Sequence, residues 1–295
     1  MIISNTKNYL KNVFNQFINL STIRKADKKL EIEKTKDTYK NILNNDLKLK
    51  QMDENGFVNI PNSFPQNLSQ ICRNNYLQKK SLFSRDMLEL FKFFNENYFG
   101  LVQNYLGENA CLINYGYQVL DSNQNVVSGN WHTDNLGNKM NFFLVIEGHE
   151  NIPTHIIPSS HKKKYFPDIL QNLRFISNFK NQKKKFNTEM IKHKTGDINI
   201  FDGNSIHRGD YETFSQNKKR IHISLEFVNI DKIKNLGFVN HPKFFFIKSF
   251  KPPFRKQNCN KNKYISEDLL NEYLKFPFIK KEFIQTENNH NYYNL

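Results

Sequence analysis

Hydrophobic and polar positions follow one period before about residue 110 of this 295-residue chain and another period after it. In the first part, apolar residues recur every three or four positions, which predicts amphipathic helices at 5–20, 66–80 and 85–106. Between the first two helices, residues 57–60 form a short apolar run that Pro61 ends, as expected for a strand. The first part of the chain is therefore expected to be mainly helical.

After residue 110 the chain consists of short runs of β-branched and aromatic residues, separated by clusters of Asn, Asp, Gly and Ser. The expected strands are 110–120, 126–132, 139–147, 153–157, 188–193, 197–202 and 219–229. Many short strands without periodic helices between them favour an antiparallel sandwich or jelly roll. The fold class that we predict is therefore α+β with a mainly β core.

We expect one core domain with an extension at each end. The core covers 51–230 and carries a helical or loop insertion near 160–187. Residues 1–50 form a charged, helical N-terminal extension, and residues 231–295 form a C-terminal extension that packs on the core. A last short helix at 266–275 begins at Ser266, a residue type that caps helices well.

Lys and Arg number 43 against 28 Asp and Glu, so the formal net charge is +15. Such a charge attracts anions, nucleic acids among them. However, Lys and Asn are frequent along the whole chain, and no stretch concentrates the charge as a nucleic-acid-binding arm would. The Lys triplets at 162–164 and 183–185 are either solvated surface or the rim of a pocket for an anionic ligand.

The three cysteines, Cys72, Cys111 and Cys259, are far apart and match neither a disulfide framework nor a zinc motif. The N-terminal segment lacks the apolar run and cleavage site of a secretory signal. The apolar run 142–146 is too short for a transmembrane segment. These features predict a protein of the reducing cytoplasm.

Three residues have the composition of a metal site. His132 and Asp134 are two positions apart, so in an extended chain their side chains point the same way. His207 follows the expected strand at 197–202 and a polar turn. Two His and one carboxylate leave three coordination positions open, as in non-haem Fe(II) oxygenases. Zinc would favour a closed tetrahedron or a third His or Cys ligand.

The spacing of His132 and Asp134 is weak evidence alone, because the chain has nine His and 28 acidic residues. His132 could equally be a surface histidine in a turn. The position at a strand end favours a functional role. Arg220 supports it, because a guanidinium on the expected strand at 219–229 can pair with a carboxylate through two hydrogen bonds.

Taken in order, these residues resemble the phytanoyl-CoA dioxygenase-like branch of the Fe(II)/2-oxoglutarate-dependent oxygenases. The resemblance covers about 50–230 and includes Glu54–Pro61, Trp131–Asp134, Ile156–Lys162, Gly196-Asp197, His207-Arg208-Gly209 and Arg220. The sequence Pro158-Ser159-Ser160-His161 replaces the usual Pro-Gly-Ser-His, and the spacing from His207 to Arg220 is slightly long.

The resemblance implies a double-stranded β-helix, or jelly roll. It implies that His132, Asp134 and His207 bind Fe(II), and that Arg220 binds the C5 carboxylate of 2-oxoglutarate, with O2 as the oxidant. Because the third ligand is a carboxylate, no coordination position is vacant for a halide, and hydroxylation is favoured over halogenation.

Further residues are candidates on weaker grounds. His222 and Tyr117 are expected beside 2-oxoglutarate, although either could instead fill the core. His161 is interpreted as structural or as part of the pocket rim. The residues expected to line the substrate pocket are Tyr115, Gln118, Trp131, Asn135, Lys139 and His155.

The sequence thus predicts a dioxygenase that hydroxylates a small molecule, either an anionic metabolite or a sugar-containing precursor. Three alternatives stay open: a redox-silent metal enzyme of the cupin type, an oxygenase directed at nucleic acid or protein, and a binding module with a vestigial metal site. Neither the substrate nor the oligomeric state can be inferred from the sequence.

Overall fold

The computed structural model describes residues 25, 27–80, 83–121, 131–134, 138–148, 153–162, 187–209, 219–231 and 266–280. The expected helix at 5–20, most of the insertion near 160–187, the first part of the strand at 126–132 and Asn135 lie outside these residues. Within the described part of the chain, antiparallel sheets and helices combine into an α+β fold, as predicted.

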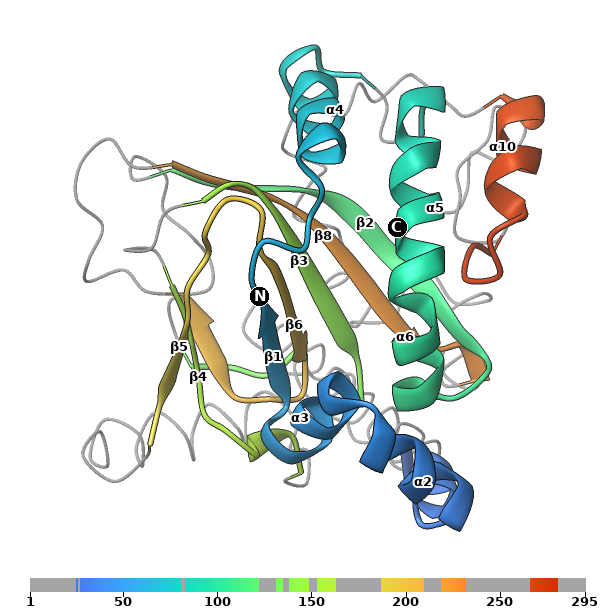
Figure 1. Ribbon diagram of the computed structural model, residues 1–295, viewed down its shortest axis with the longest axis vertical. Coiled ribbons are helices and arrows are strands. Elements are labelled where there is room, and N and C mark those ends of the chain that lie inside the picture. The colour runs from blue at the N-terminus through green and yellow to red at the C-terminus, as the bar shows by residue number, and fades with distance from the viewer. Residues whose placement is uncertain are drawn as a thin grey trace, which may run out of the picture.

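The main sheet is antiparallel and has five strands in the order β1-β6-β3-β8-β2. They are β1 (Phe57–Ile60), β6 (Ile198–Asp202), β3 (Met140–Glu147), β8 (Lys219–Asn229) and β2 (Ala110–Asp121). Strand β3 pairs with β6 on one side and β8 on the other, so residues far apart in the sequence lie side by side (Figure 1).

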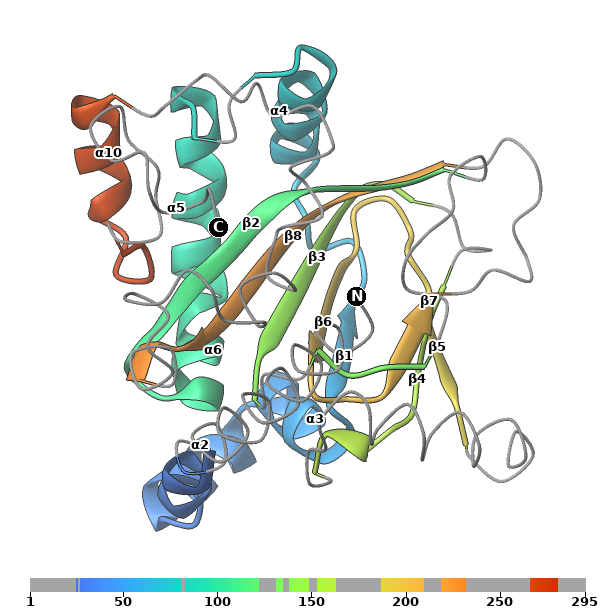
Figure 2. The same ribbon diagram turned by 180° about the vertical axis from the view of Figure 1, so that it is seen from behind.

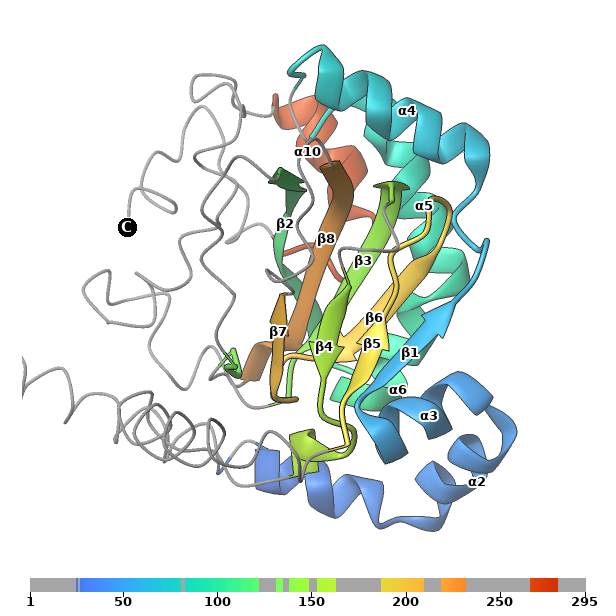
Figure 3. The same cartoon turned by 90° about the vertical axis from the view of Figure 1, so that its left-hand side faces the viewer.

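A smaller antiparallel sheet lies against one face of the main sheet, and Figure 3 shows it in front of the main sheet. Its strands, in the order β5-β4-β7, are Glu189–Ile191, Thr154–Ile156 and His207–Gly209. Phe143 and Phe201 of the main sheet pack against Ile156 and Ile191 of the small sheet in one buried cluster. The faces that the two sheets turn toward each other are called the inner faces below.

Helices cover the opposite face of the main sheet (Figures 1 and 2). They are α4 (Gln66–Leu77), α5 (Leu88–Asn97), α6 (Phe99–Leu106) and α10 (Glu267–Leu274). Strand β8 divides its side chains between the two faces. Ile221, Ile223, Leu225 and Phe227 join the core under the helices. The residues between them, Arg220, His222, Ser224 and Glu226, therefore belong to the inner face.

Two further helices lead into the first strand, α2 (Asp37–Asn45) and α3 (Leu47–Asn55). Asp46 caps α3 by accepting hydrogen bonds from the backbone of Lys48 and Leu49. Gly56 ends α3 in the left-handed conformation, with φ of 81°. A side chain there would also collide with His161 and Ser205, so both the backbone conformation and the lack of space require glycine.

Most of the predicted elements are confirmed within the described residues, including the cap of α10, where Ser266 accepts from Leu269 N. The helix expected at 85–106 instead consists of a 3₁₀ turn, η1 (Arg85–Met87), followed by α5 and α6, which meet at the non-helical Tyr98. Strand β7 was not predicted, because the sequence pattern indicates only a polar turn that presents His207 after the strand at 197–202. Among the described helices, none is both long and apolar enough to span a membrane.

Candidate metal centre

The backbone brings the three candidate ligands together through two short segments. His132 and His207 form an isolated antiparallel bridge, in which each backbone N–H donates to the other's carbonyl at 3.0 and 2.9 Å. Two residues further on, Asp134 N donates to Gly203 O at 2.8 Å. The segment that carries His132 and Asp134 is therefore fastened at both ends to the turn that precedes β7.

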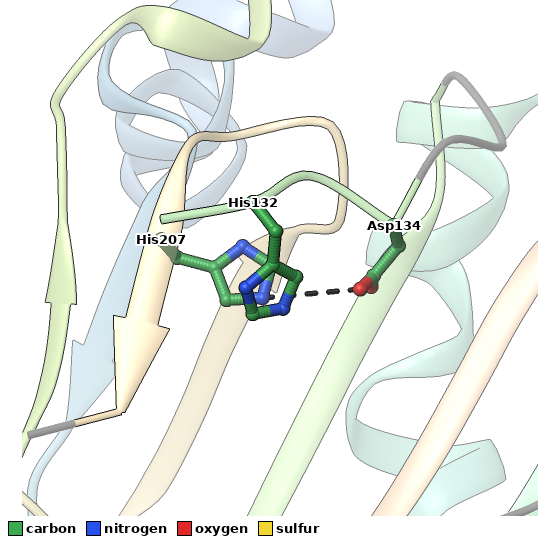
Figure 4. A group of neighbouring side chains, drawn as sticks. All are labelled: His132, Asp134 and His207. Atoms are coloured by element: carbon green, nitrogen blue, oxygen red, sulfur yellow. Dashed lines mark ion pairs between the residues drawn. The ribbon is translucent and has the colours of Figure 1, made fainter. Parts of the chain in front are cut away.

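The three side chains converge on one point (Figure 4). One ligand atom from each of His132, Asp134 and His207 lies within 4.8 Å of the other two. His207 Nε2 is 3.8 Å from Asp134 Oδ1, and the two imidazole centroids are 4.4 Å apart. Two imidazoles and a carboxylate at this spacing could hold one divalent cation while leaving other coordination positions free.

A hydrogen bond to Ser205 fixes the tautomer of His207. Its Nδ1 lies 2.8 Å from Ser205 O, and a carbonyl can only accept, so Nδ1 carries the proton. The lone pair of Nε2 therefore faces the cluster, as for histidine ligands held by a backbone carbonyl. Burial, together with nearby His132, lowers the pKa of His207 to about 4, so the ring is neutral at neutral pH.

Asp134 is held by two donors on the same oxygen. Lys139 Nζ lies 2.9 Å from Asp134 Oδ2, and Asn141 Nδ2 donates to that atom at 3.0 Å. Burial would raise the pKa of Asp134, but Lys139, His207 and His132 outweigh it and hold this pKa well below its usual range. Asp134 is thus a carboxylate anion with its other oxygen, Oδ1, facing His207.

Arg220 and His222 lie on the inner face of β8, where Arg220 is 3% and His222 0% exposed. Burial lowers the pKa of Arg220 to about 9, so its guanidinium stays charged at neutral pH. His222 Nε2 donates to Gln118 Oε1 at 2.5 Å, which places Gln118 on this face too. On the inner face of β8, Arg220 and Glu226 lie toward opposite ends of the strand, with His222 between them. Glu226 accepts a hydrogen bond from Lys139.

Two tyrosines lie elsewhere than predicted. Tyr117 donates from its hydroxyl to Cys72 O of α4 at 2.7 Å, and Tyr115 packs edge-on against Phe83 and Phe91. Both rings belong to the core under the helices. The structure therefore corrects the expectation that Tyr115 and Tyr117 line the cofactor or substrate pocket.

The side chains of Trp131 and His155 also lie elsewhere than predicted. His155 stands between the buried Thr154 and Ile156 of β4, so alternation directs it to the outer face of the small sheet. Its ring centroid is 6.5 Å from that of Trp131, and the guanidinium of Arg208 lies 5.0 Å from the Trp131 ring. These positions argue against a role for Trp131 and His155 in an inner pocket.

Lys139 is near the ligands, but it does not face a substrate as expected. It is 5% exposed and pairs with Asp134 and with Glu226 Oε2, the latter at 2.8 Å. Sequence reasoning missed the partners Asn141 and Glu226. A usable signal existed: Asn141 is a polar residue within the apolar run of β3, and Glu226 is one of the alternating polar residues of β8.

Comparison with known proteins gives a result for the fold alone. No family model matches the sequence, and no curated protein matches it either. Solved structures do match. SnoN, a non-heme alpha-ketoglutarate-dependent epimerase from nogalamycin biosynthesis, is 12% identical, with a TM-score of 0.50 over 62% of this chain and 82% of SnoN.

Two other solved structures give slightly lower scores. EctD from S. alaskensis with bound Fe is 11% identical, with a TM-score of 0.49 over 62% of this chain and 76% of EctD. HygX from Streptomyces hygroscopicus, with nickel and 2-oxoglutarate bound, is 12% identical, with a TM-score of 0.47 over 61% of this chain and 85% of HygX. At these identities, the likeness to SnoN establishes a shared arrangement of sheets and helices.

Proposed function

We propose that this protein is an Fe(II)/2-oxoglutarate-dependent oxygenase that hydroxylates a small molecule. The observation that carries the proposal is the convergence of His132, Asp134 and His207 at one point, with ligand atoms within 4.8 Å of one another. The shared fold with SnoN, whose own description is that of an alpha-ketoglutarate-dependent enzyme, supports the same chemistry.

The residues present fit an Fe(II) ion. Two neutral nitrogen donors and one carboxylate suit a divalent iron, and they occupy only one side of it. His207 already presents the correct tautomer, and Asp134 is ionised. Bound Fe(II) would supply, with 2-oxoglutarate and O2, the oxidant that removes a hydrogen atom from a substrate carbon while 2-oxoglutarate is converted to succinate and CO2.

The other residues of the inner faces are proposed to bind 2-oxoglutarate and to exclude water from the space beside it. Arg220 is the proposed partner for the C5 carboxylate of 2-oxoglutarate, because its buried cation gains from a bidentate anion. His222 and Gln118 are proposed to line the same end of the pocket. Phe143 and Phe201, which pack between the sheets, keep the interior apolar beside them.

A finer assignment of fold and family belongs to the same proposal. The inner faces of two antiparallel sheets pack together, with the three ligands on β7 and on the segment bridged to it. This arrangement supports a double-stranded β-helix, with 51–230 as its core. The order of motifs supports the phytanoyl-CoA dioxygenase-like branch. For the substrate, we propose a small anionic metabolite or a sugar-containing precursor.

The test is production of succinate from 2-oxoglutarate with Fe(II), ascorbate and O2. We expect wild-type protein to release succinate slowly without substrate, and His132→Ala and Asp134→Ala to release none. His155→Ala, on the outer face of the small sheet, is the matched control and should keep the wild-type rate. Full succinate production by either ligand variant would contradict the proposal.

The same reaction mixture, given candidate substrates, separates the possible outcomes. Hydroxylation adds one oxygen atom to the substrate mass. Inversion of a carbon centre, the outcome that the description of SnoN names, leaves the mass unchanged and alters the chromatographic or optical behaviour. Metal-dependent turnover without succinate would instead favour the redox-silent alternative.

A further inference from the structure

The geometry points to Lys139 as a positioning residue for the metal ligand Asp134. We propose that Lys139, anchored by Glu226 and assisted by Asn141, occupies one oxygen of the Asp134 carboxylate so that only the other can bind the metal. This inference rests on the proposed function, because it concerns the same metal site.

The two oxygens of Asp134 have different surroundings. Oδ2 receives Lys139 Nζ at 2.9 Å and Asn141 Nδ2 at 3.0 Å. The Asn141 amide must present its nitrogen there, since a carboxylate can only accept. A carboxylate oxygen has about two lone-pair positions, and these donors fill both. Oδ1 is the oxygen that faces His207 Nε2, at 3.8 Å.

Lys139 is itself fixed in place. Its ammonium bridges Asp134 and Glu226, and Lys139 Nζ lies 2.8 Å from Glu226 Oε2. Glu226 lies opposite Asn141 in the β3–β8 register, so the anchor and the second donor are on adjacent strands of the main sheet. Lys139 is 5% exposed, so its ammonium cannot reach water without giving up its contacts with both partly buried carboxylates.

The consequence concerns the number of open positions on the metal. Two imidazoles and a carboxylate that binds through one oxygen leave three of about six positions open in an octahedral ion. A carboxylate that chelates through both oxygens would leave only two. A chelating co-substrate takes two coordination positions on the metal. The Lys139 contact would therefore decide whether a further coordination position remains open.

The test uses Mn(II) as the probe and counts the exchangeable waters on it by water-proton relaxation. The main variant is Lys139→Met/Glu226→Gln, which removes both charges of the Lys139–Glu226 pair and leaves Asp134 with its hydrogen bond from Asn141 and the charge of the bound Mn(II). We expect relaxivity per bound Mn(II) to fall by about a third, as one open position is lost to the second carboxylate oxygen. The matched control is Lys275→Met/Glu272→Gln, the same change at an exposed ion pair of α10, and it should keep wild-type relaxivity.

A second variant keeps the test decisive if the main one fails to fold. Asn141→Ala removes the other donor to Oδ2 without altering charge, and a smaller fall in relaxivity is expected. Unchanged relaxivity in every folded variant that binds Mn(II) would overturn the positioning role and leave the proposed function standing. If wild-type protein bound no Mn(II) or Fe(II), the proposed function itself would fail.

Discussion

Gly203 packs directly against the carboxylate of Asp134. A Cβ atom on residue 203 would lie 2.7 Å from Asp134 Oδ2 and 3.2 Å from Lys139 Cε. The backbone of Gly203 is fixed as well, because its N–H donates to Lys139 O at 2.7 Å and its carbonyl accepts from Asp134 N. Glycine is thus needed at this position for the close approach of another side chain.

Gly203→Ala should therefore impair metal binding. The added methyl group must displace the Asp134 carboxylate, the only one of these neighbours proposed to bind the metal. Disturbing the support of a metal ligand commonly weakens binding by about 10–100-fold. Isothermal titration with Mn(II) measures the effect, and the melting temperature shows whether the variant is folded.

Gly100→Ala is the control for that substitution. Gly100 lies in α6, and a Cβ atom there would meet nothing within 4 Å. Alanine in a helix is favoured over glycine by about 0.5–1 kcal/mol, so this variant should be slightly more stable and bind Mn(II) as the wild type does. Equal Mn(II) affinity in both alanine variants would show that the contact between Gly203 and Asp134 does not matter.

Arg220→Met should weaken 2-oxoglutarate binding without affecting the metal. A hydrogen bond to a charged group contributes about 1.5–3 kcal/mol, so loss of a bidentate pair should raise the dissociation constant of 2-oxoglutarate at least about tenfold. The visible absorption of the Fe(II)–2-oxoglutarate complex under anaerobic conditions reports this binding. Mn(II) affinity without 2-oxoglutarate should stay unchanged.

Arg208→Met separates this effect from a general loss of positive charge. Arg208 lies on the outer face of the small sheet beside Trp131. We expect unchanged 2-oxoglutarate affinity, together with altered fluorescence of Trp131, the single tryptophan of the chain. The role of Arg220 would be refuted if both arginine variants bound 2-oxoglutarate equally well.

Most of the elements and the three candidate ligands could be proposed from the sequence because local pattern indicates them. The alternation along 219–229 and the spacing of His132 and Asp134 are visible in the sequence. Which face of a strand turns inward depends on the partner layers, which local pattern does not reveal. Tyr117 and Gln118 are neighbours on β2, yet one packs under the helices and the other joins His222.

Long-range pairs were beyond sequence reasoning for a related reason. Lys139 meets Glu226 across 87 positions of the chain, because β3 and β8 are neighbours in the sheet. The sequence shows only that Lys139 follows Asp134 closely, and this position alone led to the expectation that it lines the substrate pocket. Only the register Asn141–Glu226 shows that its charge is already matched.

Tyr117→Phe tests the corrected position of this tyrosine. Its hydroxyl donates to Cys72 O at 2.7 Å and lies 3.1 Å from Asn75 Oδ1, both in α4. Loss of the buried hydrogen bond to Cys72 O should lower the free energy of unfolding by about 0.5–1.5 kcal/mol. Affinity for 2-oxoglutarate should not change. A large loss of 2-oxoglutarate affinity in a stably folded variant would show that Tyr117 does contribute to the 2-oxoglutarate site.

His193 and His222 should make the protein less stable as the pH falls below about 6.5. Both are 0% exposed, and burial together with nearby Arg220 holds the pKa of each well below its usual value. An unfolded histidine has a pKa of about 6.5, so below that pH the unfolded chain binds protons that the folded chain does not. Proton binding to the unfolded chain then lowers the free energy of unfolding by up to about 1.4 kcal/mol for each histidine and each pH unit that the pH falls.

His222→Gln isolates one of these contributions. An amide at this position can still donate to Gln118 but does not titrate, so the unfolding free energy should decline less steeply between pH 7.5 and 5.5 than in the wild type. Urea unfolding at several pH values, with EDTA present so that metal binding does not contribute, measures both slopes. The variant loses the contact between the His222 and Phe143 rings, so it will be less stable at every pH, and only the difference in slope is diagnostic. Identical slopes would mean that His222 is protonated to the same extent in the folded and unfolded chains, contrary to its burial beside a cation.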